Sequence, residues 1–261
     1  MTATDGENDA LVGSTGFVGS NLHRSRSFGA VFSSANIAEI RGRKFRTLVC
    51  AAPGAEKWRA NLDPDADRAS VERLWESLQS VAAEKLILIS TVDVYPNPVG
   101  VDEDTAIDIE SCPPYGRHRL EVERRVADQF DSLVVRLPGL FGPGLRKNAL
   151  YDLLHDHRVD AIDARAVYQF YDVTGLSGDI SIAETAGISL LNVATEPIAI
   201  STVALEVFGK ELTPRSEGVA PRYDFRSRHA SLFGGSNGYL LQAGDVLTDI
   251  RLWVAHEWGE L

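Results

Sequence analysis

Gly13-Ser14-Thr15-Gly16-Phe17-Val18-Gly19 follows the apolar run Ala10-Leu11-Val12, and this stretch of sequence decides the fold. Glycines at every third position are typical of a strand-to-helix turn that binds a dinucleotide. The first glycine allows a tight turn, the second lets the backbone approach a pyrophosphate, and the third lets the helix pack closely on the strand. The helix that begins here would direct its unpaired N–H groups and the positive end of its dipole toward the phosphates.

The composition is that of an acidic globular protein with enough apolar residues for a full core. The chain has 261 residues, a formal net charge of −11 and 44% hydrophobic residues. Nucleic acids and anionic membranes need clustered Lys and Arg, so the charge argues against both partners. Cys50 and Cys112 are too few for a disulfide framework or a metal-ligand cluster, so we expect no metal. Residues 1–9 are acidic and polar, unlike a signal peptide, and no apolar run is long enough to span a membrane, so we expect a cytoplasmic protein.

Short apolar runs alternate with helical patterns in the first half of the chain, which predicts βαβ units and a parallel sheet. The link between the first helix and Leu48 leaves room for a very short helix or none. The expected strands are 11–12, 30–32, 48–51, 86–90 and 133–136, and the expected helices are 65–83 and 115–129. After Pro138 the weaker pattern predicts helices over 148–157, 202–208 and 245–256, strands over 166–171 and 190–193, and loops over 213–237.

Three further segments carry the chemistry. Ile89-Ser90-Thr91-Val92-Asp93-Val94-Tyr95 ends a predicted strand, Tyr115-Gly116-Arg117-His118-Arg119 opens a predicted helix, and Arg136-Leu137-Pro138-Gly139-Leu140-Phe141-Gly142-Pro143 ends the next strand. Ligands of an open parallel sheet lie beyond the carboxyl ends of its strands. We therefore expect these segments and the glycine turn to converge on one crevice.

The four segments resemble the extended short-chain dehydrogenase/reductase superfamily, the NAD(P)-dependent nucleotide-sugar epimerases and dehydratases. The resemblance runs from Leu11 to about Asn148, and the segment 191–197 is similar to the late strand and turn of that family. It implies an α/β fold, with a Rossmann-type doubly wound parallel sheet in residues 1–140. Residues 141–261 would form a small C-terminal α/β substrate-binding portion that contributes a late strand back to the sheet. The resemblance also implies NAD(P) as cofactor and a homodimer through the helices 65–83 and 115–129.

The same resemblance puts the catalytic hydroxyl on Thr91 and pairs Tyr115 with Arg119, where the family has Tyr-x-x-x-Lys. A tyrosine with a pKa of about 10 is a poor base at neutral pH, and a cation one helical turn away stabilises its phenolate. Arginine keeps the positive charge, but it cannot be deprotonated and its planar fork reaches differently from an ammonium. We expect hydride chemistry to be retained, because Thr91, Tyr115 and the glycine turn are intact.

Asp93 indicates a type of reaction. In the dehydratases and decarboxylases of this family, an acidic residue two places after the catalytic hydroxyl acts on the sugar ring. Asp93 would then be a general acid or base beside the oxidised sugar. The alternative is that Asp93 only caps a turn before Pro96.

The resemblance also implies the cofactor contacts. The end of the second strand carries no acidic residue for a ribose 2′-hydroxyl, whereas Ser33 and Ser34, with Arg41 or Arg43 nearby, could accept a 2′-phosphate. The sequence therefore favours NADP slightly over NAD. The expected cofactor-binding residues are Gly13, Thr15, Gly16, Phe17, Val18, Gly19, Ser33, Ser34, Asn36, Ile37, Ala51, Ala52, Pro53, Tyr115, Arg119, Pro138, Gly139 and Leu140.

Substrate contacts are expected from both halves of the chain. Lys57 could meet a phosphate and Trp58 could stack on a ring, unless they are a surface lysine and a packing tryptophan. The expected substrate-binding residues are Lys57, Trp58, Val92, Asp93, Lys147, Asn148 and Tyr171.

Three functions stay open on the sequence alone. The first is an NAD(P)-dependent oxidoreductase, epimerase or dehydratase that acts on a nucleotide sugar or a related hydroxy or keto substrate. The second is a simple NADP-dependent carbonyl reductase or dehydrogenase for a small substrate. The third is a non-catalytic NAD(P)-binding sensor or scaffold, which the arginine at position 119 keeps open.

Overall fold

The structure is a computed structural model that describes residues 6, 8–54, 56–215 and 217–259. Most of the acidic N-terminal stretch that is expected not to be a signal peptide lies outside the described residues. The chain divides into two compact units. The first unit comprises Met1–Asn97, Thr105–Arg136 and Leu176–Leu191, and the second unit comprises Pro98–Asp104, Leu137–Gly175 and Asn192–Leu261.

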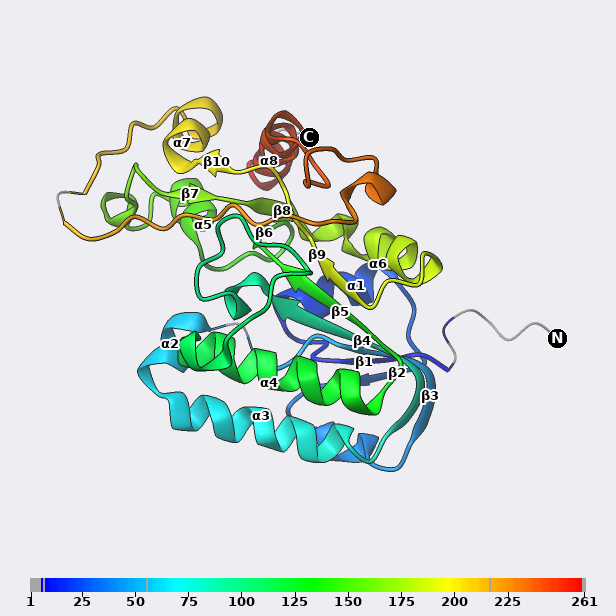
Figure 1. Cartoon of the computed structure of the whole chain (residues 1–261). Coiled ribbons are helices and arrows are strands. Elements are labelled where there is room, and N and C mark those ends of the chain that lie inside the picture. Colours follow the sequence, from blue (N-terminus) through cyan, green and yellow to red (C-terminus); the bar gives the residue numbers. More distant parts are fainter. Residues whose placement is uncertain (1–5, 7, 55, 216, 260–261) are drawn as a thin grey trace. The chain divides into compact units, whose positions relative to one another are not determined.

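A six-stranded sheet with the order β2-β1-β3-β4-β5-β9 organises the first unit (Figure 1). The pairs β1–β2, β1–β3 and β3–β4 are parallel, as the alternating sequence pattern predicts. The strand order reverses beside β1, and the crevice of an open α/β sheet lies at such a switch point, beyond the carboxyl ends of the strands. The strands are β1 Ala10–Val12, β2 Ala30–Phe32, β3 Lys44–Cys50, β4 Ala82–Thr91, β5 Ser132–Leu137 and β9 Leu190–Asn192.

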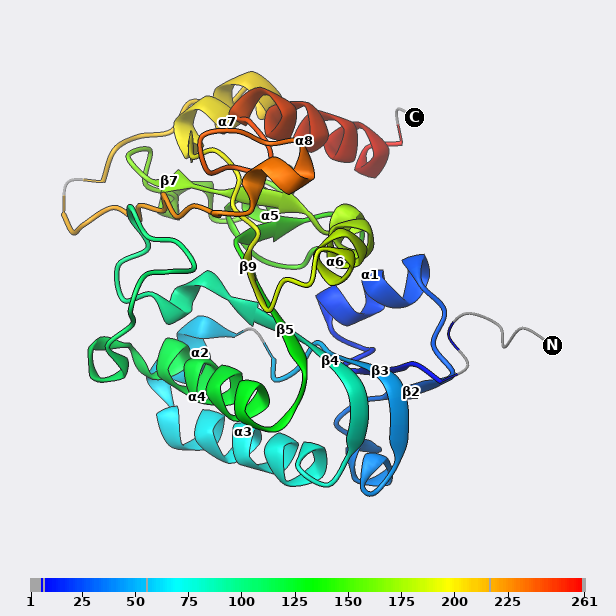
Figure 2. The ribbon, with the colours of Figure 1, turned by 45° about the vertical axis from the view of Figure 1, so that its right-hand side comes forward.

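Helices cover both faces of this sheet: α3 and α4 lie on one face, α1 and α6 on the other (Figures 1 and 2). The apolar spacing of α3 and α4 explains the first layer, because Val71, Leu74 and Leu78 of α3 and Val122 and Val126 of α4 are buried in one core cluster with the strands. The helices of the first unit are α1 Phe17–Ser25, α2 Lys57–Leu62, α3 Pro64–Leu78, α4 Pro114–Gln129 and α6 Leu176–Thr185.

The helix predicted over 115–129 is confirmed, whereas the one predicted over 65–83 ends earlier. The helix α3 stops at Leu78, because Ala82 already pairs with Lys44 at the start of β4. Two short helices of this unit, α2 and α6, are absent from the sequence prediction. The expected short link before β3 is confirmed and holds the 3-10 turn η1. The 3-10 turns are η1 Ile37–Ile40, η2 Val92–Val94, η3 Ile109–Ser111, η4 Val159–Ala161, η5 Val173–Gly175 and η6 Ala230–Phe233.

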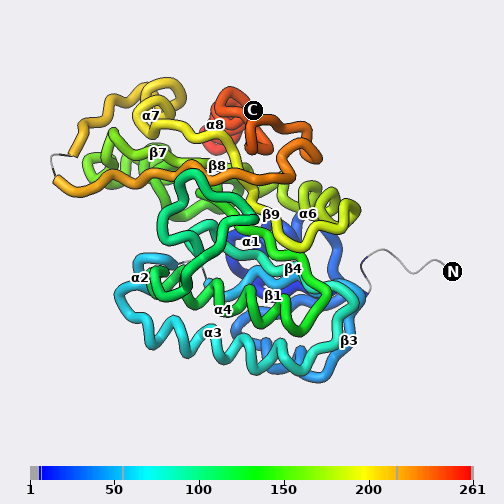
Figure 3. Tube along the Cα trace, viewed as in Figure 1, coloured from blue at the N-terminus to red at the C-terminus, as the bar shows by residue number. Residues whose placement is uncertain are grey.

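The second unit has its own core, in which Phe141, Phe170 and Trp253 are buried among aliphatic side chains of the helices. Its two small sheets pair β6 with β8 in parallel and β7 with β10 in antiparallel. Between α7 and η6, the described residues 209–215 and 217–229 form no helix or named strand, and most of them fall where loops are predicted (Figure 3). The elements are β6 Gly139–Phe141, α5 Ala149–Leu154, β7 Val167–Tyr168, β8 Phe170–Asp172, β10 Ile198–Ala199, α7 Ile200–Phe208 and α8 Ala243–Glu257.

The strand predicted over 166–171 is interrupted at Gln169. The buried amide of Gln169 donates to the carbonyls of Thr195 and Phe225 and accepts a hydrogen bond from the Phe225 N–H at 2.9 Å. The Gln169 side chain thus joins the link between β7 and β8 to the backbone of residues 195 and 225. None of the helices in the described part of the chain has the length and hydropathy that a membrane span requires.

A buried ion pair ties α4 to β5 in the first unit. Arg136 Nη2 lies 2.6 Å from Glu123 Oε2, and both side chains are almost fully buried. The hydroxyl of Tyr95 lies 2.7 Å from Arg136 Nη1, and Ser90 donates to Glu123 at 2.5 Å. Removal of one partner would leave the other charge buried without compensation.

We expect Arg136→Met to lower the free energy of unfolding by about 3–5 kcal/mol, measured by urea denaturation. Arg125→Met is the matched control, because Arg125 also joins a glutamate, Glu72, but this pair is about one-third exposed. The control should cost about 1 kcal/mol or less. Equal losses in the two variants would contradict the importance of the buried pair.

Candidate functional site

The glycine turn is built by close approaches of the backbone. Gly13 has a φ of +87°, and a Cβ there would lie 2.6 Å from the carbonyl oxygen of Ala51 at the end of β3. A Cβ on Gly19 would lie 2.1 Å from the carbonyl oxygen of Gly13, so α1 starts pressed against the turn. Gly16 is the N-cap residue of α1 and supplies no side-chain cap. Together with Thr15, Phe17 and Val18, these glycines place the helix N-terminus at the switch point of the sheet.

The residues expected at the adenosine end form a closed loop after β2. The Ser33 N–H donates to Asn36 Oδ1 at 2.7 Å, and the Asn36 amide donates to the Val31 carbonyl at 3.3 Å. Ile37 begins the turn η1, and Ser34 is exposed. The two arginines expected near a 2′-phosphate have other neighbours: Arg43 lies over the rings of Phe32 and Phe45, and Arg41 lies 4.0 Å from Glu76.

Tyr115 lies where α4 meets the end of β4. A Cβ on Gly116 would lie 2.1 Å from the carbonyl oxygen of Asp93, so the first turn of α4 packs backbone against backbone on η2. A side-chain hydrogen bond joins Tyr115 to Thr91. The Tyr115 N–H donates to Asn61 Oδ1 on α2 at 3.0 Å, which caps α4 from a neighbouring helix. The structure therefore brings together the tyrosine and the threonine that the sequence predicts as partners.

Arg119 lies over the face of the Tyr115 ring, with 4.2 Å between the guanidinium carbon and the ring centroid. Its Nη2 donates to the Gly54 carbonyl at 2.7 Å, and its Nη1 donates to Asp67. Asp67 Oδ2 also lies 2.7 Å from Nδ1 of the buried His118. The Arg119 guanidinium is thus held beside the tyrosine by Asp67 and by the loop that follows β3.

The pKa shifts follow from these contacts. Burial raises the pKa of Tyr115 above its ordinary value, and the charge of Asp93 acts in the same direction, while Arg119, Thr91 and Lys57 partly oppose them. Burial alone would also raise the pKa of Asp67, but hydrogen bonds from Arg119 and His118 hold it below its usual range. The cluster thus holds an anionic Asp67 and a tyrosine that is mostly protonated at neutral pH.

Asp93 lies beside a lysine. Asp93 Oδ1 is 2.7 Å from Nζ of Lys57, the first residue of α2, and the Asp93 side chain is 18% exposed against 45% for Lys57. The turn that follows β4 is capped by Thr91, whose oxygen accepts the Asp93 N–H at 3.1 Å. Of the other expected substrate contacts in this unit, Val92 is buried and Trp58 is exposed.

The small residues expected around the cofactor lie directly after β3. Ala51, Ala52 and Pro53 lead from the contact with Gly13 to Gly54, whose carbonyl binds Arg119. This loop therefore contacts both the glycine turn and the tyrosine helix. From sequence, Asp67 is only a favourable residue in the first turn of a helix. Its place beside Arg119 depends on the packing of α3 against α4, which no local pattern shows.

The remaining expected residues belong to the second unit and are described within it. Pro138, Gly139 and Leu140 follow β5, and the Leu140 carbonyl accepts a hydrogen bond from the Asn148 amide at 2.7 Å. Asn148 Oδ1 caps α5 by accepting from the N–H groups of residues 150 and 151. Lys147 precedes this cap, and Tyr171 is buried in β8. Their contacts with a substrate stay a prediction.

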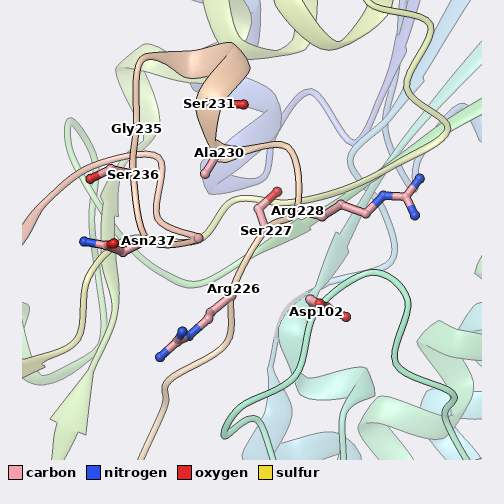
Figure 4. A pocket seen from close by; sticks show the side chains of 10 residues that line it. Asp102, Arg226, Ser227, Arg228, Ala230, Ser231, Gly235, Ser236 and Asn237 are labelled. Atoms are coloured by element: carbon pink, nitrogen blue, oxygen red, sulfur yellow. The ribbon is translucent and has the colours of Figure 1, made fainter.

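A separate pocket of about 370 Å³ lies in the second unit, between Asp102 and the loop that carries Arg226, Ser227 and Arg228 (Figure 4). Both arginines have carboxylate neighbours: Arg228 pairs with Asp104, and Arg226 Nε lies 3.9 Å from an oxygen of Asp224. This pocket is lined by residues other than those predicted for the site, and the Ser227 hydroxyl donates to Glu103 at 2.6 Å. We interpret these contacts as structural: they hold the loop that carries Arg226 to Arg228 against the carboxylates of Glu103, Asp104 and Asp224.

We expect Gly116→Ala to destabilise the fold by about 1–3 kcal/mol, because the added methyl group would overlap the Asp93 carbonyl and push α4 away from η2. Gly178→Ala in α6 is the matched control, since a Cβ there meets open space. A helical glycine replaced by alanine in open space should gain about 0.5–1 kcal/mol. Urea denaturation of the two variants checks the contrast, and equal behaviour would contradict the close approach.

Comparison with solved structures identifies several enzymes of similar fold. A UDP-N-acetylglucosamine 4-epimerase from Methanobrevibacter ruminantium M1, in complex with UDP-N-acetylmuramic acid, has a TM-score of 0.75 at 12% identity over 98% of this chain and 99% of the other. An NAD-dependent NDP-hexosamine 5,6-dehydratase of tunicamycin biosynthesis has a TM-score of 0.73 at 17% identity over 97% of both chains. The enzyme RMD from Pseudomonas aeruginosa, complexed with NADPH, has a TM-score of 0.72 at 15% identity over 96% and 98%. These identities show the shared fold and no more.

Sequence comparison adds the family. No protein of curated function matches the chain by sequence. The model of the NAD-dependent epimerase/dehydratase family matches residues 38–168, a segment that contains Thr91, Asp93, Tyr115 and Arg119. The match begins after the glycine turn, so the turn supports a dinucleotide-binding fold independently of the family match. Since the matched segment spans half of the chain and the fold agrees with it, the chain belongs to the NAD-dependent epimerase/dehydratase family.

Proposed function

We propose that this protein is an NAD(P)-dependent oxidoreductase, epimerase or dehydratase that acts on a nucleotide sugar or a related hydroxy or keto substrate. The observation that carries the proposal is the buried Tyr115, hydrogen-bonded to Thr91 and covered by the Arg119 guanidinium. Family membership supports the class of reaction. The neighbour that holds UDP-N-acetylmuramic acid supports the class of substrate by analogy of fold.

The first unit fits a dinucleotide in its own geometry. The N-terminus of α1 lacks a side-chain cap at Gly16, and its N–H groups and dipole would hold a pyrophosphate. The small residues Ala51 and Ala52 after β3 leave room along the same edge of the sheet. When bound, the nicotinamide accepts or returns a hydride. Ser33 and Ser34, in a β2 end without an acidic residue, favour NADP, and this preference stays part of the proposal.

Tyr115 and Thr91 would manage the proton. As a hydride leaves the carbon of a substrate alcohol, the Tyr115 phenolate takes the hydroxyl proton, and in the reverse direction the phenol returns it. Thr91 would hydrogen-bond the same substrate oxygen and orient it. Arg119 stabilises the phenolate from the face of the ring, because a cation over an aromatic face is attracted to it. Asp93 would assist dehydration or epimerisation as an acid or base. Its carboxylate forms an ion pair with Lys57.

One observation favours a second candidate. Two nitrogens of the Arg119 guanidinium are held by Asp67 and the Gly54 carbonyl. A site built in this way could bind NAD(P) without turning a substrate over, as a sensor or scaffold. A simple carbonyl reductase for a small substrate is the alternative within enzymes. The cytoplasmic location and the homodimer stay predictions. The homodimer can be tested by native mass spectrometry.

We expect Tyr115→Phe to lower turnover by about 10²- to 10⁴-fold, because the proton acceptor is lost while the ring remains. Purified protein would be incubated with NAD or NADP and a panel of UDP- and dTDP-sugars, and products would be separated by chromatography. Dinucleotide binding should be retained in this variant, because the ring and Arg119 remain and only the hydroxyl is removed. Tyr151→Phe on α5 is the matched control and should turn over normally. Full activity of Tyr115→Phe would exclude the proposed role.

The Arg119→Lys variant distinguishes an enzyme from a non-catalytic NAD(P)-binding protein. The proposal expects turnover in the wild type, in the variant or in both, since each carries a cation one helical turn after Tyr115. The same product assay, with dinucleotide binding measured in parallel by calorimetry, checks this. Dinucleotide binding without turnover in either form would support the sensor or scaffold instead.

A further inference from the structure

Helix α2 contacts the candidate site at two points. Its first residue, Lys57, has Nζ 2.7 Å from Asp93 Oδ1. Its fifth residue, Asn61, accepts the Tyr115 N–H at 3.0 Å. Residues four apart lie on the same face of a helix, so α2 directs one face toward the end of β4 and the start of α4. Trp58 and Leu62, each one residue further along, are 66% and 77% exposed.

The Lys57–Asp93 pair lies next to the tyrosine. Asp93 follows Thr91 by two residues, and its carbonyl is the group that Gly116 approaches. The charges that act on Tyr115 are Arg119 and Lys57, which favour its phenolate, and Asp93, which disfavours it. Asp67 of α3 accepts a hydrogen bond from Arg119 and also contacts His118, the residue before Arg119 on α4. The Asp67 carboxylate therefore offsets part of the Arg119 charge. The ionisation of Tyr115 therefore depends on how far a nearby positive charge compensates the Asp93 carboxylate.

We propose that Lys57 is a second cation that serves Tyr115: it balances the Asp93 carboxylate and thereby keeps that negative charge from opposing the phenolate. The side chain acts through Asp93 and Tyr115, so Lys57 is a positioning residue. This assigns Lys57 a role other than the phosphate contact that the sequence suggests. The inference deepens the proposed function and rests on it, because ionisation of Tyr115 has a catalytic use in a dehydrogenase-type reaction.

The sign of the effect follows from the charges. Without the Lys57 ammonium, the Asp93 carboxylate loses the positive charge that lies 2.7 Å from its Oδ1. Its negative charge then acts more strongly on the tyrosine, and a nearby negative charge disfavours a second one. The pKa of Tyr115, which burial already raises, should rise further. The phenolate fraction at a fixed pH should then fall, and the rise of the oxidation rate with pH should move to higher pH.

The test is a titration of Tyr115 in the full-length protein, followed by NMR of ring-labelled tyrosines. The Tyr115 signal is assigned by its loss in Tyr115→Phe. We expect Lys57→Met to raise the pKa of Tyr115 by about 1 unit, a roughly tenfold loss of phenolate at a fixed pH. Lys57→Arg keeps the charge and should change the pKa of Tyr115 little. Circular dichroism across the titration confirms that each variant remains folded.

Arg59→Met is the matched control. Arg59 lies on the same helix, and its removal deletes the same charge, but its side chain is 71% exposed and pairs with Glu56 at 3.4 Å. The pKa of Tyr115 should be unchanged in this variant. An unchanged pKa in Lys57→Met would overturn the inference, and so would an equal rise in Lys57→Arg or in Arg59→Met. Absence of turnover in both the wild type and Arg119→Lys would instead count against the proposed function. The titration needs no activity, so the two failures can be told apart.

Discussion

The site depends on how closely α4 approaches the end of β4. Only a residue without a side chain fits where Gly116 meets the Asp93 carbonyl, because a Cβ there would lie 2.1 Å from that oxygen. This backbone contact fixes Tyr115 against Thr91 and brings Asp93 into the electrostatic surroundings of the tyrosine. A second close approach, between Gly19 and Gly13, presses α1 onto the turn at the switch point of the sheet. Both contacts lie at carboxyl ends of strands, where this fold class builds its sites.

Charges around the tyrosine come in opposed pairs. Arg119 is paired with Asp67 and lies over the ring, and Lys57 is paired with Asp93. Each pair spans two elements, so the electrostatics of the site depend on the packing of the short helix α2 and of α3 against α4. A family member with arginine at position 119 can thus keep cations beside its tyrosine, held by partners that the surrounding helices supply.

Sequence patterns predicted the sheet, the glycine turn and the tyrosine helix, because glycine spacing and apolar periodicity are local signals of close approach and burial. The pairing of Thr91 with Tyr115 followed from a family resemblance. Asp67 and Asn61 could not be found this way, since each contacts the site across a helix–helix interface. The predicted helix over 65–83 is too long for the same reason. Its apolar spacing continues to residue 83, but Ala82 and Ala83 pair with β3 instead.

The central claim is that the glycine turn and the tyrosine site serve one dinucleotide. Native mass spectrometry of the purified protein, alone and with added NAD(H) or NADP(H), tests it most directly. The account predicts one dinucleotide per chain, either retained through purification or taken up on addition. Retention would point to chemistry in which the cofactor is recycled within each turnover, and uptake from solution to a reductase that exchanges it. A protein that binds neither dinucleotide would contradict the account.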